Sequence, residues 1–266
     1  MIVCIKQVPD TTQVRIDPKT NTLIRQGIPT IVNPYDLHAL EAAVELKENH
    51  GGFITALTMG PPQAKEALKE AISAGCDGGV LLTDRAFAGS DTLATSYILS
   101  AAIRRLDADN KVDLIICGQQ SIDGDTAQVG PGIAQRLNYS QLTYVSKIRE
   151  MDIELGNVIV ERRLENGTQV VSGRLPALIT VVKEINEYRY ASLANLIKAA
   201  KFEPIIWNQE YLKLDKSRIG LKGSPTTVRR IFAPPRKSSG EIVNYKSENS
   251  REIMKSIIDI ISKVRQ

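Results

Sequence analysis

An alternation of two hydrophobic periods over the first 150 residues constrains the fold of this chain most strongly. Short apolar runs rich in β-branched residues alternate there with longer segments whose apolar residues recur at helical spacing. This order is typical of βαβ units, which build a parallel sheet covered by helices on both faces. The apolar runs are nearly continuous, as in strands buried on both sides. The predicted strands are residues 2–8, 53–58, 79–82 and 114–117, and the predicted helices are residues 37–47, 63–74, 92–106 and 127–137.

The pattern changes after residue 140, where two β-rich runs flank the turn sequence Glu165-Asn166-Gly167. This arrangement predicts a β-hairpin. A further apolar run then predicts a strand that returns to the sheet, and a short helix follows it. We therefore predict an open, mainly parallel, doubly wound α/β sheet of the Rossmann-like, adenine-nucleotide-binding kind, in a domain of residues 1–202. The hairpin strands are residues 158–163 and 168–172, the returning strand is residues 178–182, and the helix is residues 191–200.

Residues 203–266 predict a C-terminal arm that ends in an amphipathic helix. The stretch 220–240 contains Ser-Pro and Pro-Pro pairs and is typical of extended chain. The helix could fold back on its own domain or pack on a partner chain, and the open arm favours the partner. The predicted helix is residues 252–264, with Ile253, Ile257, Ile258, Ile260 and Ile261 on its apolar side.

The composition argues against nucleic acid and membranes as partners. Lys and Arg number 34 against 30 Asp and Glu, so the net charge of +4 offers no basic surface for nucleic acid. No apolar stretch approaches the length of about 18 residues that a transmembrane helix needs. The sequence at Met1 enters a strand without a basic region or a cleavage site, so we expect a cytoplasmic protein.

Cysteine and histidine usage argues against metal sites and side-chain catalysis. Three cysteines, Cys4, Cys76 and Cys117, lie far apart in apolar runs without CxxC spacing, which predicts buried thiols in a reducing compartment. The two histidines, His38 and His50, supply too few ligands for a histidine-rich metal site. We therefore predict no metal site and no catalytic side chain.

The segment after Cys117 offers the strongest candidate ligand site, because ligands of open parallel sheets bind beyond the carboxyl ends of the strands. Asp125 could cap the following helix, whose first N–H groups, from Thr126 onward, would then face a phosphate. Two carboxylates would repel a diphosphate, so we assign Asp123 to ribose hydroxyls or to capping the turn. A plain capped helix explains the spacing equally well, since neither a Walker lysine nor a G-x-G-x-x-G motif is present.

Three further loops leave the same predicted edge of the sheet. They are Asn33-Pro34-Tyr35-Asp36, where Asp36 is the expected helix cap, Met59-Gly60-Pro61-Pro62, and residues 83–92. Taken alone, each loop is explained as the segment that leads into the next helix, without a ligand. Four loops that converge on one edge favour a shared ligand site.

These loops carry a family resemblance. The sequences Lys6-Gln7-Val8-Pro9-Asp10, Asn33-Pro34-Tyr35-Asp36 and Gly118-Gln119-Gln120-Ser121-Ile122-Asp123 occur in order. Together with Leu175-Pro176-Ala177 and Asn186-Glu187-Tyr188-Arg189-Tyr190-Ala191-Ser192-Leu193, they closely resemble the beta subunit of electron-transfer flavoprotein over essentially the whole chain. The resemblance implies a heterodimer with an alpha subunit and no independent catalysis. In the housekeeping form of this family the site holds AMP, and in the electron-bifurcating form it holds a second FAD.

Two positions make the chain similar to the bifurcating group. Asp36 stands where the housekeeping pattern has Cys, and Gly124 stands where it has an acidic residue. The third loop, residues 83–92, also resembles that group. The resemblance thus implies FAD that takes a hydride from NADH, with ferredoxin and a flavin-containing dehydrogenase acting on acyl-CoA or 2-hydroxy acids as acceptors. A non-bifurcating subunit with AMP and a nucleotide-binding module of the universal-stress type remain as alternatives.

The predicted cofactor contacts fall into two groups. The first is implied by the resemblance, and in it Gly130 and Gly132 leave room for a ligand or a neighbouring backbone. In the second, Gly60 and Gly89 leave room for a nicotinamide, while three polar side chains bind the flavin ring or the NADH ribose. The first group is Cys4, Asn33, Pro34, Tyr35, Asp36, Met59, Ser121, Ile122, Asp123, Gly124, Asp125, Thr126, Ala127, Gln128, Val129, Gly130, Pro131 and Gly132; the second is Gly60, Gly89, Ser90, Asp91 and Thr92.

Overall fold

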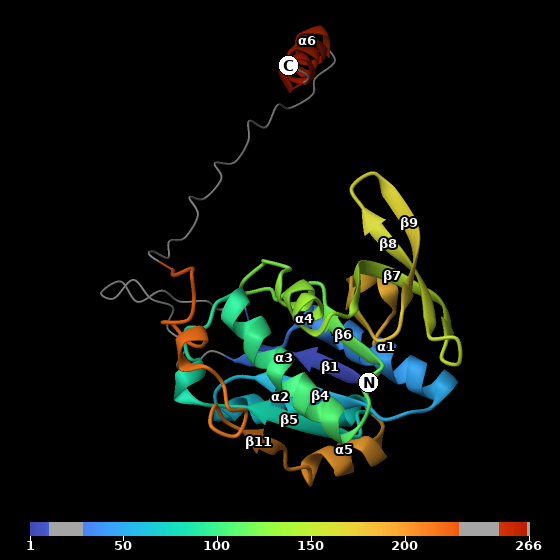
Figure 1. Ribbon diagram of the computed structural model, residues 1–266. Helices are drawn as coiled ribbons and strands as arrows, with labels where there is room; N and C mark the ends of the chain where they lie inside the picture. Colours follow the sequence, from blue (N-terminus) through green and yellow to red (C-terminus); the bar gives the residue numbers. More distant parts are fainter. Residues whose placement is uncertain (11–28, 229–249, 265–266) are drawn as a thin grey trace. The chain divides into compact units, whose positions relative to one another are not determined.

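The computed structural model describes residues 1–10, 29–228 and 250–264, and the chain divides into two compact units, residues 1–231 and 232–266. The first unit is built on a nine-stranded sheet in the order β11-β5-β4-β1-β6-β10-β7-β8-β9 (Figure 1). Strands β11 to β7 are parallel, and β8 and β9 form an antiparallel hairpin at the edge. The predicted doubly wound α/β fold is confirmed. The strands are β1 (Ile2–Ile5), β4 (Thr55–Met59), β5 (Gly78–Leu82), β6 (Leu114–Gly118), β7 (Ser140–Asp152), β8 (Asn157–Leu164), β9 (Gly167–Arg174), β10 (Ala177–Val181) and β11 (Ile205–Trp207), with β2 (Gln7–Pro9) and β3 (Thr30–Val32) in a separate antiparallel pair.

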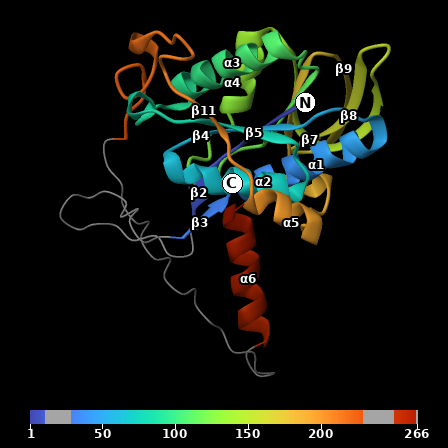
Figure 2. The same ribbon diagram turned by 90° about the horizontal axis from the view of Figure 1, so that it is seen from below.

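Helices cover both faces of the sheet (Figure 2). Along β1, Ile2 packs into the hydrophobic cluster under α3 and α4, and Val3 into the cluster under α1, α2 and α5. This alternation explains why the strand sequences are continuously apolar. The helices are α1 (Pro34–His50), α2 (Lys65–Ala74), α3 (Thr92–Asp109), α4 (Val129–Leu137), α5 (Leu193–Ala200) and, in the second unit, α6 (Ser250–Val264).

The order of the strands creates a topological switch point between β1 and β6. From β1 the chain proceeds to β4 and β5 on one side, and from β6 it proceeds to β7, β8 and β9 on the other before β10 returns to lie beside β6. The crossover connections therefore diverge at this pair, and a crevice is expected where the two strands end. The end of β1 at Ile5 and the end of β6 at Gly118 thus mark the place for a ligand.

The predicted first strand, residues 2–8, is interrupted at Lys6 and divides into β1 and β2. The Lys6 N–H donates to a carboxylate oxygen of Asp36 (2.8 Å) instead of to a strand neighbour. Asp36 was expected to cap the first helix, and this expectation is wrong. Helix α1 begins earlier, with Asn33 as N-cap and Pro34 in the first turn, and Asp36 lies inside the helix.

The C-terminal boundary differs from the predicted one at residues 202/203. Strand β11 pairs with β5, and Trp207, Leu214 and Ile219 are buried in the cluster under α3. These side chains hold residues 203–228 on the sheet, so the compact unit extends to Ile231. Strands β7 and β11 were not predicted, and part of the expected extended stretch, residues 229–240, lies outside the described residues.

The second unit contains α6, and the predicted terminal helix is confirmed. Its apolar residues Ile257, Ile258, Ile260 and Ile261 are 46–62% exposed, and within the described residues of this unit, 250–264, nothing covers its apolar side. None of the helices in the described ranges is both long and apolar enough to cross a membrane.

Replacement of Trp207 tests whether residues 203–228 belong to the folded unit. Trp207 is 6% exposed and stacks on Tyr211 with ring centroids 5.1 Å apart. We expect Trp207→Ala to lower the free energy of unfolding by about 3–5 kcal/mol, as for other buried aromatic side chains. Ile206 on the same strand is 62% exposed, and Ile206→Ala is the control, with a change within about 0.5 kcal/mol. Equal small losses in urea unfolding of both variants would show that this segment adds nothing to the core.

Candidate functional site

A single carboxylate joins the two strands that flank the switch point. Asp36 accepts hydrogen bonds from the Lys6 N–H (2.8 Å) after β1 and from the Gly118 N–H (3.2 Å) at the end of β6. Its side chain is buried, and burial raises the pKa of Asp36 to about 7, although hydrogen bonds from Asn33, Lys6 and Gly118 oppose the shift. Asp36 therefore joins the ends of β1 and β6 at the place where the crevice is expected, and burial brings its pKa close to neutral pH.

Gly118 allows α1 to approach the end of β6. A Cβ atom at this position would overlap the Asp36 carboxylate and would lie 2.8 Å from the backbone carbonyl carbon of Tyr35. Because the Tyr35 carbonyl carbon is a backbone atom, this overlap cannot be relieved by rotating a side chain. Beside it, the Lys183 ammonium lies 4.9 Å from the centroid of the Tyr35 ring.

Asn33 makes the second connection across the switch point. Its amide donates to the Gln120 carbonyl (2.8 Å) and accepts from the Ile122 N–H (3.1 Å). Its own N–H donates to the Lys6 carbonyl (2.9 Å). Asn33 thus orders the start of the turn after β6, because its side chain binds two backbone groups of this turn and also the Asp36 carboxylate.

Lys6 and Asp123 form the third connection. The Lys6 ammonium lies 2.6 and 2.8 Å from the two carboxylate oxygens of Asp123. Burial would raise the pKa of Asp123, but hydrogen bonds from Lys6 and Ser121 outweigh burial and lower it. The lysine therefore offsets the negative charge that was expected to repel a diphosphate.

The turn between β6 and α4 is irregular. Asp125 (φ 49°) and Ala127 (φ 53°) both adopt left-handed backbone, so the helix begins at Val129 and not at residue 127. Asp125 was expected to cap α4, and this expectation is wrong; Gln128 is the N-cap, with no side-chain cap hydrogen bond. The first N–H groups of α4 are thus left for solvent or an anion.

Two glutamines that the sequence analysis did not select lie at the same rim. The Gln120 amide donates to Asp125 (2.7 Å), and the Gln119 amide donates to the side-chain oxygen of Gln120 (3.2 Å). A carboxylate only accepts, so Asp125 fixes the orientation of both amides. The Gln119 Oε1 atom is then buried without a hydrogen-bond partner among the described residues, which suits a ligand donor or a bound water. The position of Gln119 and Gln120 directly after β6 is the sequence signal that could have identified them as site residues.

The rim glycines are used mainly for packing. A Cβ atom on Gly130 would lie 2.6 Å from Thr180 Cγ2, and one on Gly132 would lie 2.9 Å from Ser96 Cβ. One on Gly60 would lie 2.9 Å from Ala64 Cβ. Gly130 and Gly132 were expected to leave room for a ligand or for a neighbouring part of the chain. In the structure, side chains of the same chain occupy the space beside both glycines. Gly124 is different, because a Cβ atom there would meet only the Ser121 hydroxyl oxygen, at 3.3 Å.

The third loop is occupied by contacts within the chain. The Gly89 backbone has a φ of +76°, and a Cβ atom there would lie 3.2 Å from Leu221 Cβ. Ser90 Oγ accepts from the Gly220 N–H (3.0 Å), and Asp91 caps α3. Thr92 reaches the phosphate turn, where its hydroxyl donates to Gln128 (3.2 Å).

Two thiols lie beneath this rim. Cys4 and Cys117 are register partners on the adjacent strands β1 and β6, and Met59 ends β4 on the same face. A hydrogen bond with Cys4, together with burial, raises the pKa of Cys117 well above its usual value, so the group stays a thiol. Cys117 was not among the predicted contacts, although its register beside Cys4 places it equally near the crevice.

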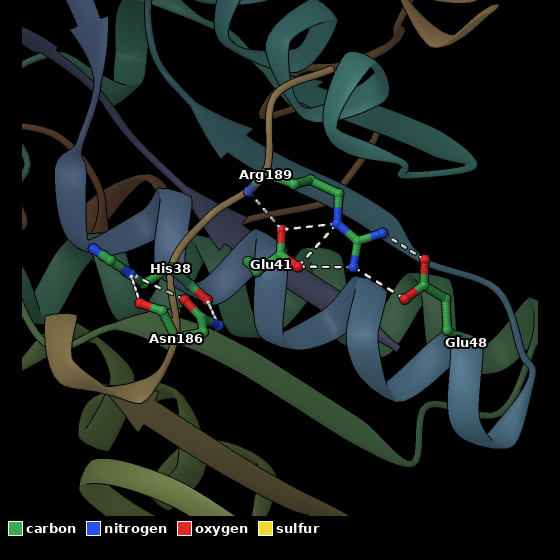
Figure 3. A network of polar contacts seen from close by, with 5 residues as sticks. All are labelled: His38, Glu41, Glu48, Asn186 and Arg189. Carbon is green, nitrogen blue, oxygen red and sulfur yellow. Dashed lines mark hydrogen bonds and ion pairs between the residues drawn. The ribbon is translucent and has the colours of Figure 1, made fainter. Parts of the chain in front are cut away.

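A second polar network holds the segment before α5 against α1 (Figure 3). The Arg189 guanidinium pairs with Glu41, which is buried, and with Glu48. The Asn186 side chain contacts the His38 ring (3.0 Å) and donates to the His38 carbonyl (3.1 Å). These contacts fix the residues that lead into α5.

Comparison with known proteins identifies the family of this chain. The family described as electron transfer flavoprotein domain matches residues 20–207. The chain belongs to the electron transfer flavoprotein family. It is of the beta-subunit type, and its general role is electron transfer in flavoprotein complexes. It is 50% identical to "Protein FixA" of Azotobacter vinelandii (97% of this chain, 92% of the relative) and 44% identical to "Electron transfer flavoprotein subunit beta" of Clostridium acetobutylicum (100% and 98%). It is also 49% identical to "Caffeyl-CoA reductase-Etf complex subunit CarD" of Acetobacterium woodii (94% and 93%).

Substitution of Gly118 tests the close approach at the switch point. Gly118→Ala forces its Cβ atom against the Tyr35 backbone, so we expect a loss of about 1–3 kcal/mol in urea unfolding. Gly124→Ala is the matched control in the same segment, and it has room for a methyl group. An unchanged stability of Gly118→Ala would contradict the described packing.

Titration of Asp36 gives a pH-dependent stability with a defined sign. The folded-state pKa of about 7 lies above the ordinary value of about 3.9 for unfolded Asp, so the folded state binds the proton more tightly. The contribution of Asp36 is fully present below pH 4 and is lost as the pH rises through 7. We expect a slope of at most about 1.4 kcal/mol per pH unit in this window. Subtracting the profile of Asp36→Asn isolates it, and a difference that does not vary with pH between 4 and 8 would refute the assignment.

Proposed function

We propose that this chain is the beta subunit of an electron-bifurcating electron transfer flavoprotein and that the switch-point crevice binds FAD. The observation that carries the proposal is Gly124, where an added Cβ atom would meet one side-chain hydroxyl and no backbone, in the turn that leads to an α4 helix without a side-chain cap. An acidic side chain at Gly124 would bring charge and bulk to the place where the phosphates of a ligand would lie. Glycine leaves that place to a dinucleotide, which is larger than AMP.

The residues present fit such a ligand. The first N–H groups of α4, at Val129 and Gly130, suit phosphate oxygens, and the unpartnered Gln119 Oε1 atom suits a donor group. When bound, FAD supplies the redox chemistry by taking a hydride from NADH and passing electrons singly to ferredoxin and to a dehydrogenase. The part of the chain is to bind and orient the cofactor, with Asp36, Asn33 and Lys6 holding the rim in place.

The second unit supports a heterodimer with an alpha subunit. The exposed apolar side of α6 suits packing against another surface. We infer that the C-terminal arm and this helix pack on the alpha subunit. A second apolar surface lies on α5, where Leu193, Leu196 and Ile197 are 49–74% exposed. The name of the relative CarD supports a partner that acts on a CoA thioester.

A subunit with structural AMP is the alternative. It keeps the same fold and the same partner, but the crevice then contributes no redox chemistry. The third alternative, a nucleotide-binding module of the universal-stress type, is dropped because the chain belongs to the electron transfer flavoprotein family.

The decisive experiment identifies the nucleotides released by heat from the purified heterodimer. We expect two FAD and no AMP, and bleaching of flavin absorbance on rapid mixing with NADH. One FAD plus AMP, without reduction by NADH, would establish the non-bifurcating carrier.

Gly124→Asp tests which feature selects the larger ligand. A carboxylate beside the phosphates repels them, so we expect FAD affinity to fall about tenfold, while AMP is retained better. Gly124→Ala adds only a methyl group and should keep FAD. The readout is the FAD to AMP ratio after purification, and an equal ratio in both variants would show that charge at residue 124 does not select the cofactor.

A further inference from the structure

A short C-terminal segment fastens the third loop of the rim. We call residues 219–226 the latch. Its Gly220 N–H donates to Ser90 Oγ (3.0 Å), and its Leu221 N–H donates to the Ala88 carbonyl (3.1 Å). Ser224 Oγ accepts from the Asp91 N–H (2.8 Å). The latch thus lies beside the end of the loop and forms hydrogen bonds with Ala88, Ser90 and Asp91.

The fit of the latch depends on a glycine. Gly220 is buried and has left-handed backbone with a φ of +62°. A Cβ atom at this position would overlap the carbonyl oxygen of Ala86, which is a backbone atom. A side chain there would therefore push the latch away from the loop.

Asp91 connects the latch to helix α3. Its Oδ1 atom accepts from the N–H groups of Leu93 and Ala94 and so caps the helix. Its Oδ2 atom accepts from the N–H (3.1 Å) and the hydroxyl (2.8 Å) of Thr226. These hydrogen bonds lower the pKa of Asp91 although burial opposes them, so the carboxylate stays charged and holds both elements.

The next residue continues the connection to the phosphate turn. Thr92 is the first residue of α3, and its hydroxyl donates to the side chain of Gln128 (3.2 Å). Gln128 is the N-cap of α4, the helix that offers free N–H groups at the crevice. Hydrogen bonds from Thr226 to Asp91 and from Thr92 to Gln128, joined by the peptide bond between Asp91 and Thr92, therefore connect the latch to the beginning of α4.

We propose that the latch is a positioning element of the nucleotide site, which holds the third loop and the beginning of α4 in their binding arrangement. The proposal rests on the proposed function, since it assigns the nucleotide to this crevice. The latch contacts the loop, and its own residues are not among the proposed nucleotide contacts. Loosening the latch therefore speeds release of the nucleotide without removing a contact to it.

The test compares two glycine variants in the full-length chain, co-expressed with its alpha subunit. Gly220→Ala displaces the latch. Gly156→Ala is the matched control, because Gly156 has nearly the same φ of +65° and no atom within 4 Å of its Cβ position. Both variants carry the same backbone strain, and only the first disturbs packing. Thr226→Val removes the hydroxyl that binds Asp91 and serves as a second variant if Gly220→Ala does not fold.

We expect the bound adenine nucleotide to dissociate about tenfold faster from Gly220→Ala than from Gly156→Ala, which corresponds to one lost hydrogen bond. Hydrogen exchange at the Val129 and Gly130 amides should also accelerate in Gly220→Ala alone. Equal dissociation rates in the two variants, with nucleotide present, would overturn the latch and leave the proposed function intact. If the wild type holds no adenine nucleotide, the proposed function fails, and hydrogen exchange at these amides still decides whether the latch orders α4.

Discussion

The hydrogen bonds of Asp36 are the contact on which the rest of the site depends. Strands β1 and β6 are neighbours, but the segments that follow them are not paired with each other, because β2 after β1 pairs with β3 and β6 leads into an irregular turn. One buried carboxylate binds the first N–H after β1 and the last N–H of β6. Asn33 and the pair of Lys6 with Asp123 extend this connection outward. The crevice is thus built from a few long-range polar contacts on a rigid sheet.

The sheet and its helices were predictable because their signal is local. The central strands β1, β4, β5, β6 and β10 are apolar on both faces, and the helices that cover them repeat apolar residues at helical spacing. The break at Lys6 was not predictable, since it depends on a carboxylate 30 residues away that competes for its N–H. The position of Asp36 could not be inferred either, because Asp at the start of a helix is most often a cap. The same limit applies to β11, a strand of three residues whose role is set by its neighbour β5.

The glycines show why the candidate site was harder to predict than the fold. Glycine permits close approach, and the sequence does not tell whether a ligand or the chain itself approaches. At Gly130 and Gly89 the neighbour is the chain, through Thr180 and Leu221. At Gly124 the neighbouring space is largely open, and this position gives the most information about the ligand. Gln119 was missed for a related reason, because its importance comes from an unsatisfied oxygen atom and not from a motif.

The pair of Lys6 with Asp123 has a consequence for how an anion is attracted to this rim. Many phosphate sites present an unpaired lysine, whose attraction reaches across solvent and weakens as salt is added. Here the ammonium already contacts both oxygens of a carboxylate, so an approaching phosphate meets a nearly neutral dipole. For the proposed nucleotide, attraction would then come from the short-range N–H groups of α4 and from shape. Binding of this kind would depend less on ionic strength than binding to a basic surface.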